Sequence, residues 1–150
     1  MKVLVFVKAT RNSEKGVVTD QRKFSKMLAD MGTFNELLVK AGIMQEADGL
    51  KPSSAGKRLK FKKGKVSVID GPFAETKELV AGYWVWNVKS MDEAVEWAKR
   101  CPNPMPGDEG VLEIRPTFSA EEFDALVASA AQRPEKAKSR RARSKAKSKK

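Results

Sequence analysis

The 150-residue sequence contains no histidine, and this absence limits the chemistry open to the protein. Imidazole changes charge near neutral pH and is the most frequent general acid and base in enzymes. Any reaction mechanism that needs an imidazole is therefore excluded for this chain.

Cysteine is almost absent too, because only Cys101 occurs. No internal disulfide can form, which fits a reducing cytosol. Cys101 follows a predicted helix, whose C-terminal end does not lower the pKa of a thiol, so we expect a structural role. With no histidine and no carboxylates at calcium-loop spacing, we expect no metal site. The phosphate-binding patterns GxxxxGK[ST] and GxGxxG are missing, and we expect no cofactor.

Long apolar runs are also missing. No stretch reaches 18 apolar residues, so the sequence predicts no transmembrane helix and no membrane partner. The first ten residues, MKVLVFVKAT, contain the run VLVFV, which is too short for a secretory signal and is followed by no cleavage site. It predicts a buried β-strand instead, and we expect a cytoplasmic location.

Positive charge is abundant, but it is concentrated in residues 133–150, RPEKAKSRRARSKAKSKK. This segment has ten Lys or Arg and one acid, a net +9, and subtracting it from +11 leaves +2 for residues 1–132. It has no aliphatic side chain larger than Ala, so we expect a disordered tail. Such a tail either binds polyanions such as DNA or RNA without sequence preference, or is a solvated appendage with no target. The candidate phosphate-binding residues are Arg140, Arg141, Arg143, Lys145 and Lys147.

Hydrophobic periodicity predicts alternating strands and helices in residues 1–132. The expected elements are a strand at 3–7, a helix from Thr19 or Asp20 to Gly42, a loop at 48–56, a hairpin of 58–61 and 65–70, a strand at 79–88, a helix after Ser90, a strand at 111–116 and a helix at about 120–131. Ser90 with Glu93, and Ser119 with Glu122, form capping boxes. This order predicts an α+β fold, a ferredoxin-like sandwich in which helices cover one face of an antiparallel sheet.

The strand at 79–88 carries Tyr83, Trp84, Val85 and Trp86 in succession, so apolar side chains point to both faces of the sheet. Helices can cover one face, and the other face needs a partner. A second copy is the simplest cover, which predicts a homodimer with its sheets face to face. Trp84 and Trp86 share a face and line either an aromatic ligand pocket, the core or the dimer interface.

The segment DGPFAETKE, residues 70–78, begins with a corner at Gly71 and a proline. Asp70 either hydrogen-bonds nearby backbone amides and holds this corner, or acts in a site with Glu75 and Lys77. A carboxylate beside an ammonium group can position a substrate or shift a pKa for proton transfer, so these three residues are the catalytic candidates. Glu75, Lys77 and Glu78 can equally form a solvated run of charges with no site. We expect Phe73 to fold back onto the core.

The same nonamer resembles the signature of the YCII-related, or DGPF-domain, proteins. The similarity covers about residues 1–117 and extends to MKVLVFVKA, LLVKAGIM, GLKPSSAGKRLKFKKGKVSVIDGPF, GYWVWNV, MDEAVEWAKRCP and LEIRP. The resemblance implies a domain of the dimeric α/β-barrel type with a pocket near the sheet interface. Arg115 matches the arginine of the family's last strand and can clamp a carboxylate, or it pairs with Glu113 or Asp70.

A purely structural dimer, whose tail affects only solubility or the choice of partner, is compatible with these features, and so are three functions. The first is a dimeric domain that binds a small molecule near the sheet interface, with a tail that adds polyanion binding. The second is a nucleic-acid-associated, transcription-related protein that acts through the tail. The third is an enzyme that uses Asp70 and Lys77 on a small substrate, although the histidine–aspartate pair suspected in one branch of the superfamily has no counterpart here.

Overall fold

The structure, a computed structural model, describes residues 1–132. The predicted tail at 133–150, with its five candidate phosphate-binding residues, lies outside the described residues. The chain divides into two compact units, one of residues Met1–Thr117 and one that begins at Phe118. Among residues 1–132, no helix has both the length and the apolar character needed to cross a membrane.

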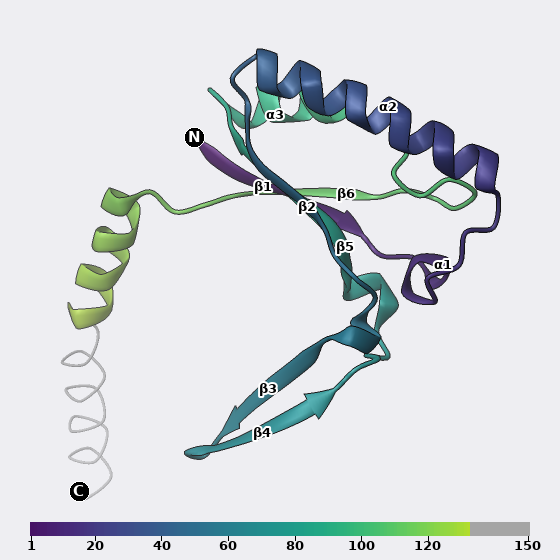
Figure 1. Cartoon of the computed structure of the whole chain (residues 1–150). Helices are drawn as coiled ribbons and strands as arrows, with labels where there is room; N and C mark the ends of the chain where they lie inside the picture. The colour runs from purple at the N-terminus through teal and green to yellow at the C-terminus, as the bar shows by residue number, and fades with distance from the viewer. Residues whose placement is uncertain (133–150) are drawn as a thin grey trace, which may run out of the picture. The chain divides into compact units, whose positions relative to one another are not determined.

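The first unit contains a four-stranded antiparallel sheet in the order β2-β5-β1-β6 (Figure 1). Its strands are β1 (Lys2–Lys8), β2 (Met44–Gly49), β5 (Val80–Asn87) and β6 (Leu112–Pro116). A helix connects β1 to β2 and another connects β5 to β6, so the chain forms two strand–helix–strand halves. This arrangement confirms the predicted α+β, ferredoxin-like fold.

Two helices, α2 (Gln21–Lys40) and α3 (Met91–Ala98), cover one face of this sheet (Figure 1). The Asp20 side chain accepts hydrogen bonds from two backbone N–H groups at the start of α2, and Gly42 follows its end with a φ of 70°. The predicted bounds of this helix are confirmed. Ser90 caps α3 as expected, whereas the Glu93 carboxylate accepts from the Lys89 N–H.

The core lies between the helices and the sheet. Val3, Val5 and Val7 of β1 point toward the helices and are buried. Phe34 of α2 contacts both Trp84 and Trp86 edge-on, with ring centroids 6.3 Å apart in each case. Both tryptophans therefore belong to the core, one of the alternatives that the sequence left open.

Within the first unit, residues 1–117, no helix lies over the opposite face of the sheet (Figure 1). Leu4 and Phe6 alternate with the buried valines of β1, and the strand register places Tyr83 and Val85 beside them. These four residues define what we call the open sheet face. Leu4, Phe6 and Tyr83 are half-buried and Val85 is buried, so this apolar stripe is only partly exposed within the described residues.

Strand β2 was not predicted, and the expected loop at 48–56 is wrong at its start, because Asp48 and Gly49 belong to this strand. The strand MQEADG lies at the edge of the sheet and places only Met44 and Ala47 against the core. Such a short, polar edge strand has no clear alternation of apolar residues. Three single-turn helices were also missed: α1 (Arg11–Glu14), η1 (Ser53–Ala55) and η2 (Thr76–Glu78).

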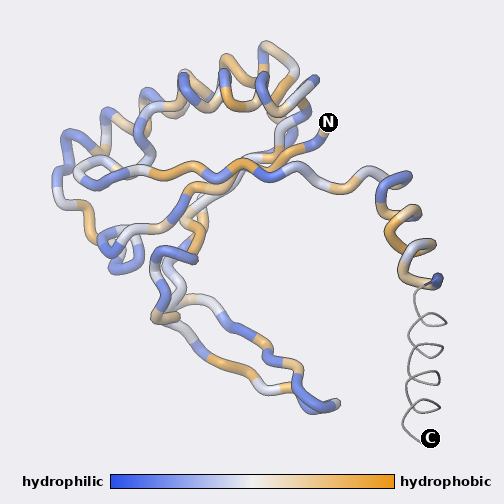
Figure 2. The backbone as a smooth tube through the Cα atoms, turned by 180° about the vertical axis from the view of Figure 1, so that it is seen from behind, coloured by the Kyte–Doolittle hydropathy of each residue, from blue (hydrophilic) through white to orange (hydrophobic). Residues whose placement is uncertain are grey.

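The predicted hairpin forms from β3 (Lys57–Lys62) and β4 (Lys65–Asp70), but it makes a two-stranded sheet of its own. Lys63 and Gly64 both have positive φ, 49° and 75°, as a two-residue hairpin turn requires. In Figures 1 and 2 the hairpin extends away from the four-stranded sheet, on the side opposite α2 and α3. Every residue of β3 and β4 is exposed.

The second unit is helical over residues 120–132. The Glu122 N–H donates to the Ser119 hydroxyl at 3.1 Å, and the Ser119 N–H donates to the Glu122 carboxylate at 2.8 Å. This reciprocal pair confirms the predicted capping box. Phe123, Leu126 and Val127 are exposed on this helix.

Candidate functional site

The corner after β4 is held by backbone and side-chain groups around Ser53. The Ser53 hydroxyl accepts the Phe73 N–H at 3.1 Å and donates to the Glu14 carboxylate, which also accepts the Ser53 N–H at 3.1 Å. The Gly71 N–H donates to the Gly56 carbonyl at 3.1 Å. This corner joins α1, η1 and the DGPF segment, although these elements are far apart in sequence.

Asp70 does not hold the corner through backbone amides, so that expectation is wrong. Its carboxylate forms an ion pair with Lys57 across the base of the hairpin, and its side chain is 76% exposed. Phe73 was expected to fold back onto the core, but it is half-buried and stacks under the Arg58 guanidinium, 4.0 Å from the ring centroid. The hairpin base therefore carries a cation–π contact instead of a core contact.

Glu75 and Lys77 line a cavity of about 810 Å³ together with residues from the end of β1 and the loop before β6. We call it the charged cavity. Its cations are Lys8, Arg11 and Lys77, and its acids are Glu75, Asp108, Glu109 and Glu113. This volume falls within the usual range for small-molecule sites. The structure thus brings two of the three catalytic candidates together, and it leaves Asp70 outside this cavity.

Some of these charges already have partners. Lys8 lies 3.5 Å from the Glu113 carboxylate. The Asp108 carboxylate accepts a hydrogen bond from the Thr10 hydroxyl at 2.8 Å and from the Asn12 amide at 3.1 Å. These bonds fix one wall of the cavity.

Four other charged groups, Arg11, Lys77, Glu75 and Glu109, form no ion pair within residues 1–132. Within the part of the chain that the structure describes, two cations and two carboxylates are therefore free to meet a ligand. A cavity with both signs of charge suits a small molecule that carries an anionic group together with a hydrogen-bond donor or an amine.

Arg115 lies on β6, opposite Leu4, and its side chain shares the open sheet face. Within residues 1–132 it forms no ion pair, so neither Glu113 nor Asp70 is its partner there. It does not line the charged cavity. Its predicted role as an anion anchor stays a prediction.

A tyrosine–carboxylate group lies on the open sheet face. The Tyr83 hydroxyl donates to Glu46 at 2.6 Å and lies 3.5 Å from an Asp48 carboxylate oxygen. The hydrogen bond to Glu46 raises the pKa of Tyr83 to about 12, and desolvation and the nearby negative charges act in the same direction. Tyr83 therefore remains a neutral hydrogen-bond donor near neutral pH.

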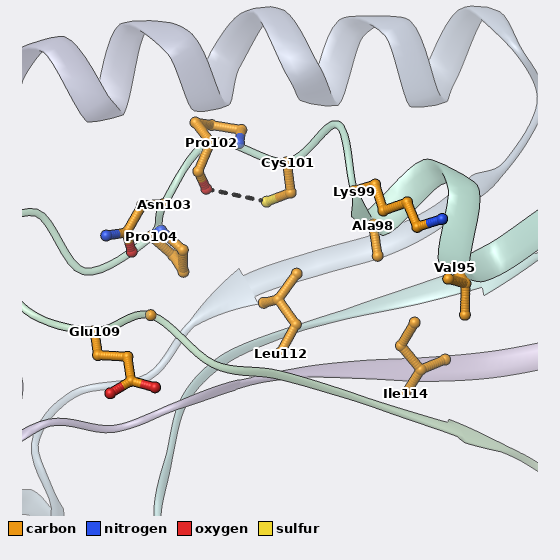
Figure 3. Close-up of a pocket in the computed structure, with 11 residues that line it drawn as sticks. Val95, Ala98, Lys99, Cys101, Pro102, Asn103, Pro104, Glu109, Leu112 and Ile114 are labelled. Atoms are coloured by element: carbon orange, nitrogen blue, oxygen red, sulfur yellow. Dashed lines mark hydrogen bonds between the residues drawn. The ribbon is translucent and has the colours of Figure 1, made fainter.

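Figure 3 shows a second cavity, of about 600 Å³, between α3 and the edge strand β6. Ala98, Leu112 and Ile114 contribute apolar side chains, and the Cys101 Sγ lies 3.3 Å from the Pro102 carbonyl oxygen (Figure 3). Burial raises the pKa of Cys101 to about 12. A thiol with this pKa is a poor nucleophile near neutral pH, which agrees with the structural role expected.

The sequence did not predict Lys8, Arg11, Asp108 and Glu109 as cavity residues. Lys8 ends a strand, Arg11 lies in a one-turn helix, and the other two belong to a loop that follows three prolines. No local spacing links these segments. Only the pairing of β1 with β6 brings them together.

The fold and the site define a class of protein, a ferredoxin-like α+β domain with an open sheet face and a charged cavity beside it. The family model described as the YCII-related domain matches residues 1–123, and the chain belongs to this family. The uncharacterized protein R00369 of Rhizobium meliloti (strain 1021) is 34% identical over 91 residues, 61% of this chain and 73% of the relative. These findings confirm the resemblance. The relative's name gives no activity, so an activity has to be argued from the site.

Proposed function

We propose that this protein is a dimeric binding domain for a small, charged molecule, which it holds in the charged cavity. The observation that carries the proposal is the placement of Glu75 and Lys77 in one cavity with Lys8 and Arg11. Two cations and two carboxylates of this cavity have no ion-pair partner among residues 1–132, and they favour a ligand with an anionic group and an amine or hydroxyl group. A cytoplasmic location forms part of the same proposal.

The dimer is supported by the position of the cavity. Lys8 and Glu113 lie on the same side of the sheet as Leu4 and Phe6, so the cavity opens beside the open sheet face. A second copy on that face would cover the apolar stripe and shield the cavity from water. Shielding strengthens charge–charge interactions with a ligand, because the local dielectric constant falls.

A ligand screen tests the proposal. Amino acids, hydroxy acids and sugar phosphates are titrated into the ¹⁵N-labelled protein, and backbone shifts are followed by NMR. We expect one of these classes to shift residues 74–77 and 108–113 and to bind at least about tenfold more weakly to Lys77→Met. Lys89→Met, outside the cavity, is the matched control and should bind normally. Shifts elsewhere, or equal affinity in both variants, would contradict the proposed site.

A second candidate function concerns the tail, whose net charge of +9 favours polyanions. A dimer would carry two such tails, and their contacts with phosphates would be sensitive to salt. We expect the full chain to bind duplex DNA with an affinity that falls steeply with salt. A chain that ends at Gln132 should lose most of this affinity in fluorescence anisotropy. Equal binding by the two chains would remove the tail from the proposed function.

The enzyme hypothesis receives less support from the geometry. It requires Asp70 and Lys77 to act on one substrate, but Asp70 pairs with Lys57 at the hairpin base, whereas Lys77 lines the charged cavity. The cavity's own carboxylates would have to replace Asp70 in any such reaction. We therefore propose binding and not catalysis.

A further inference from the structure

The hairpin of β3 and β4 has one apolar side. In an antiparallel pair, directly opposed residues point to the same side, and successive pairs alternate. The register pairs Leu59 with Val68 and Phe61 with Val66, so these four side chains share a side. Their exposed fractions are 56%, 61%, 75% and 54% in that order. We call them the apolar hairpin face.

The other side of the hairpin is strongly basic. Arg58, Lys60, Lys62 and Lys65 point away from the apolar hairpin face. Residues 57–70 contain six Lys or Arg and one acid, a net +5. Lysines on exposed strands discourage pairing with unrelated strand edges, so this side suits solvent while the apolar hairpin face needs a partner.

The hairpin also needs that partner for its own stability. A two-stranded sheet is marginally stable in water unless a further element covers its apolar face. Its base is fixed by the corner at Gly71 and by the Arg58–Phe73 stack. Beyond this base, β3 and β4 contact chiefly each other. The direction of the hairpin is set at the base, and no other element of residues 1–117 covers its apolar face.

We infer that a second copy of this chain covers the hairpin, with the apolar hairpin face of one subunit packed on the open sheet face of the other. The inference rests on the dimer proposed above and names the surfaces that complete it. Figures 1 and 2 show the hairpin on the side of the four-stranded sheet opposite α2 and α3, which is the side of the open sheet face. A copy that covers this face therefore meets the hairpin.

The area that a stable interface needs agrees with this arrangement. A stable interface buries about 800 Å² on each partner, and a stripe whose Val85 is already buried is too small to supply this area alone. The apolar hairpin face adds four side chains to it.

Disulfide trapping between two full-length chains tests the contact. Both chains carry Cys101→Ser; one also carries Phe61→Cys and the other Leu4→Cys. We expect the mixed pair to form an interchain disulfide after mild oxidation. Replacing Phe61→Cys by Lys60→Cys, on the basic side, should reduce its yield at least about tenfold, because neighbouring residues of a strand point to opposite sides.

Sedimentation of the otherwise native chain distinguishes a failure of the hairpin contact from a failure of the proposed dimer. Phe61→Ser should raise the dimer dissociation constant at least about tenfold and Lys60→Ser by less than about twofold. A monomeric native chain at micromolar concentration would overturn the dimer and this inference together. A native dimer with no trapped disulfide and no effect of Phe61→Ser would overturn this inference alone. Binding to anionic lipid vesicles that depends on Phe61, with no trapped disulfide, would also overturn it and assign the hairpin to a membrane surface.

Discussion

At Gly71, a methyl group in place of the hydrogen would lie 1.8 Å from the Ser53 carbonyl oxygen. The backbone at Gly71 and the backbone at Ser53 are both held by hydrogen bonds, so neither segment can move away without breaking the corner. We expect Gly71→Ala to lower the free energy of unfolding by about 1–3 kcal/mol, as overpacking usually does. Urea denaturation followed by tryptophan fluorescence measures this change.

Gly32 provides the matched control for this substitution. It lies inside α2, and a methyl group there would meet no atom within 4 Å. Gly32→Ala should leave the stability unchanged or raise it by up to about 1 kcal/mol, because alanine is the better helix former. If both variants unfold at the same urea concentration, the close approach at Gly71 is not what requires glycine.

The buried thiol of Cys101 leads to a second prediction, on how stability depends on pH. Because burial raises its pKa from 9.0 to about 12, the native protein keeps the thiol proton at pH values where the unfolded chain loses it. The stability that this group contributes is complete below pH 9 and falls as the pH rises toward 12.

A thiol reagent such as DTNB measures the same effect near pH 8. The native chain should react at least about tenfold more slowly than the chain unfolded in guanidinium, because only the thiolate attacks. Equal rates would show that Cys101 is neither buried nor protonated as the structure implies.

At the scale of elements, periodicity and caps predicted α2 and α3 well, since each has a regular apolar stripe and a side chain that caps its first turn. Strand β2 was not predicted, because an edge strand with only one covered face has few apolar residues in its sequence. The hairpin was predicted from its turn, but no local pattern shows that it pairs only with itself. Pairing depends on tertiary contacts.

The link between α2 and β5 is testable. The buried Trp84 donates its indole N–H to the Asn35 side chain at 2.9 Å. Asn35→Ala would leave this donor without an acceptor, and we expect a loss of about 1–3 kcal/mol in thermal or urea unfolding. Asn87→Ala, at an exposed position of β5, should change stability by less than about 0.5 kcal/mol. A similar cost for both would show that the Trp84 hydrogen bond does not tie the helix to the sheet.

At the scale of the whole molecule, the sequence predicted the fold and a sheet face that no helix of residues 1–117 covers, but only part of the site. Glu75 and Lys77 were identified because they lie in one recognisable segment, DGPFAETKE. Arg11 and Asp108, at the other side of the cavity, come from segments almost a hundred residues apart. Only the antiparallel pairing of β1 with β6 reveals that they are neighbours.

If a second copy completes the charged cavity, ligand binding and dimerisation must be coupled. A molecule that binds the dimer more tightly than the monomer also strengthens the dimer by the same factor. We expect Leu4→Glu, on the open sheet face, to shift the mass from a dimer toward the 16.6 kDa chain and to weaken ligand binding at low protein concentration.

Val39→Glu is the control, because Val39 is exposed on α2, the helix that covers the other face of the sheet. It should leave both the mass and the ligand affinity unchanged in sedimentation and NMR titration. A Leu4→Glu monomer that binds ligand as tightly as the native protein would show that one chain holds the whole site. The dimer would then cover the sheet without forming the cavity, and the two halves of the proposed function would be independent.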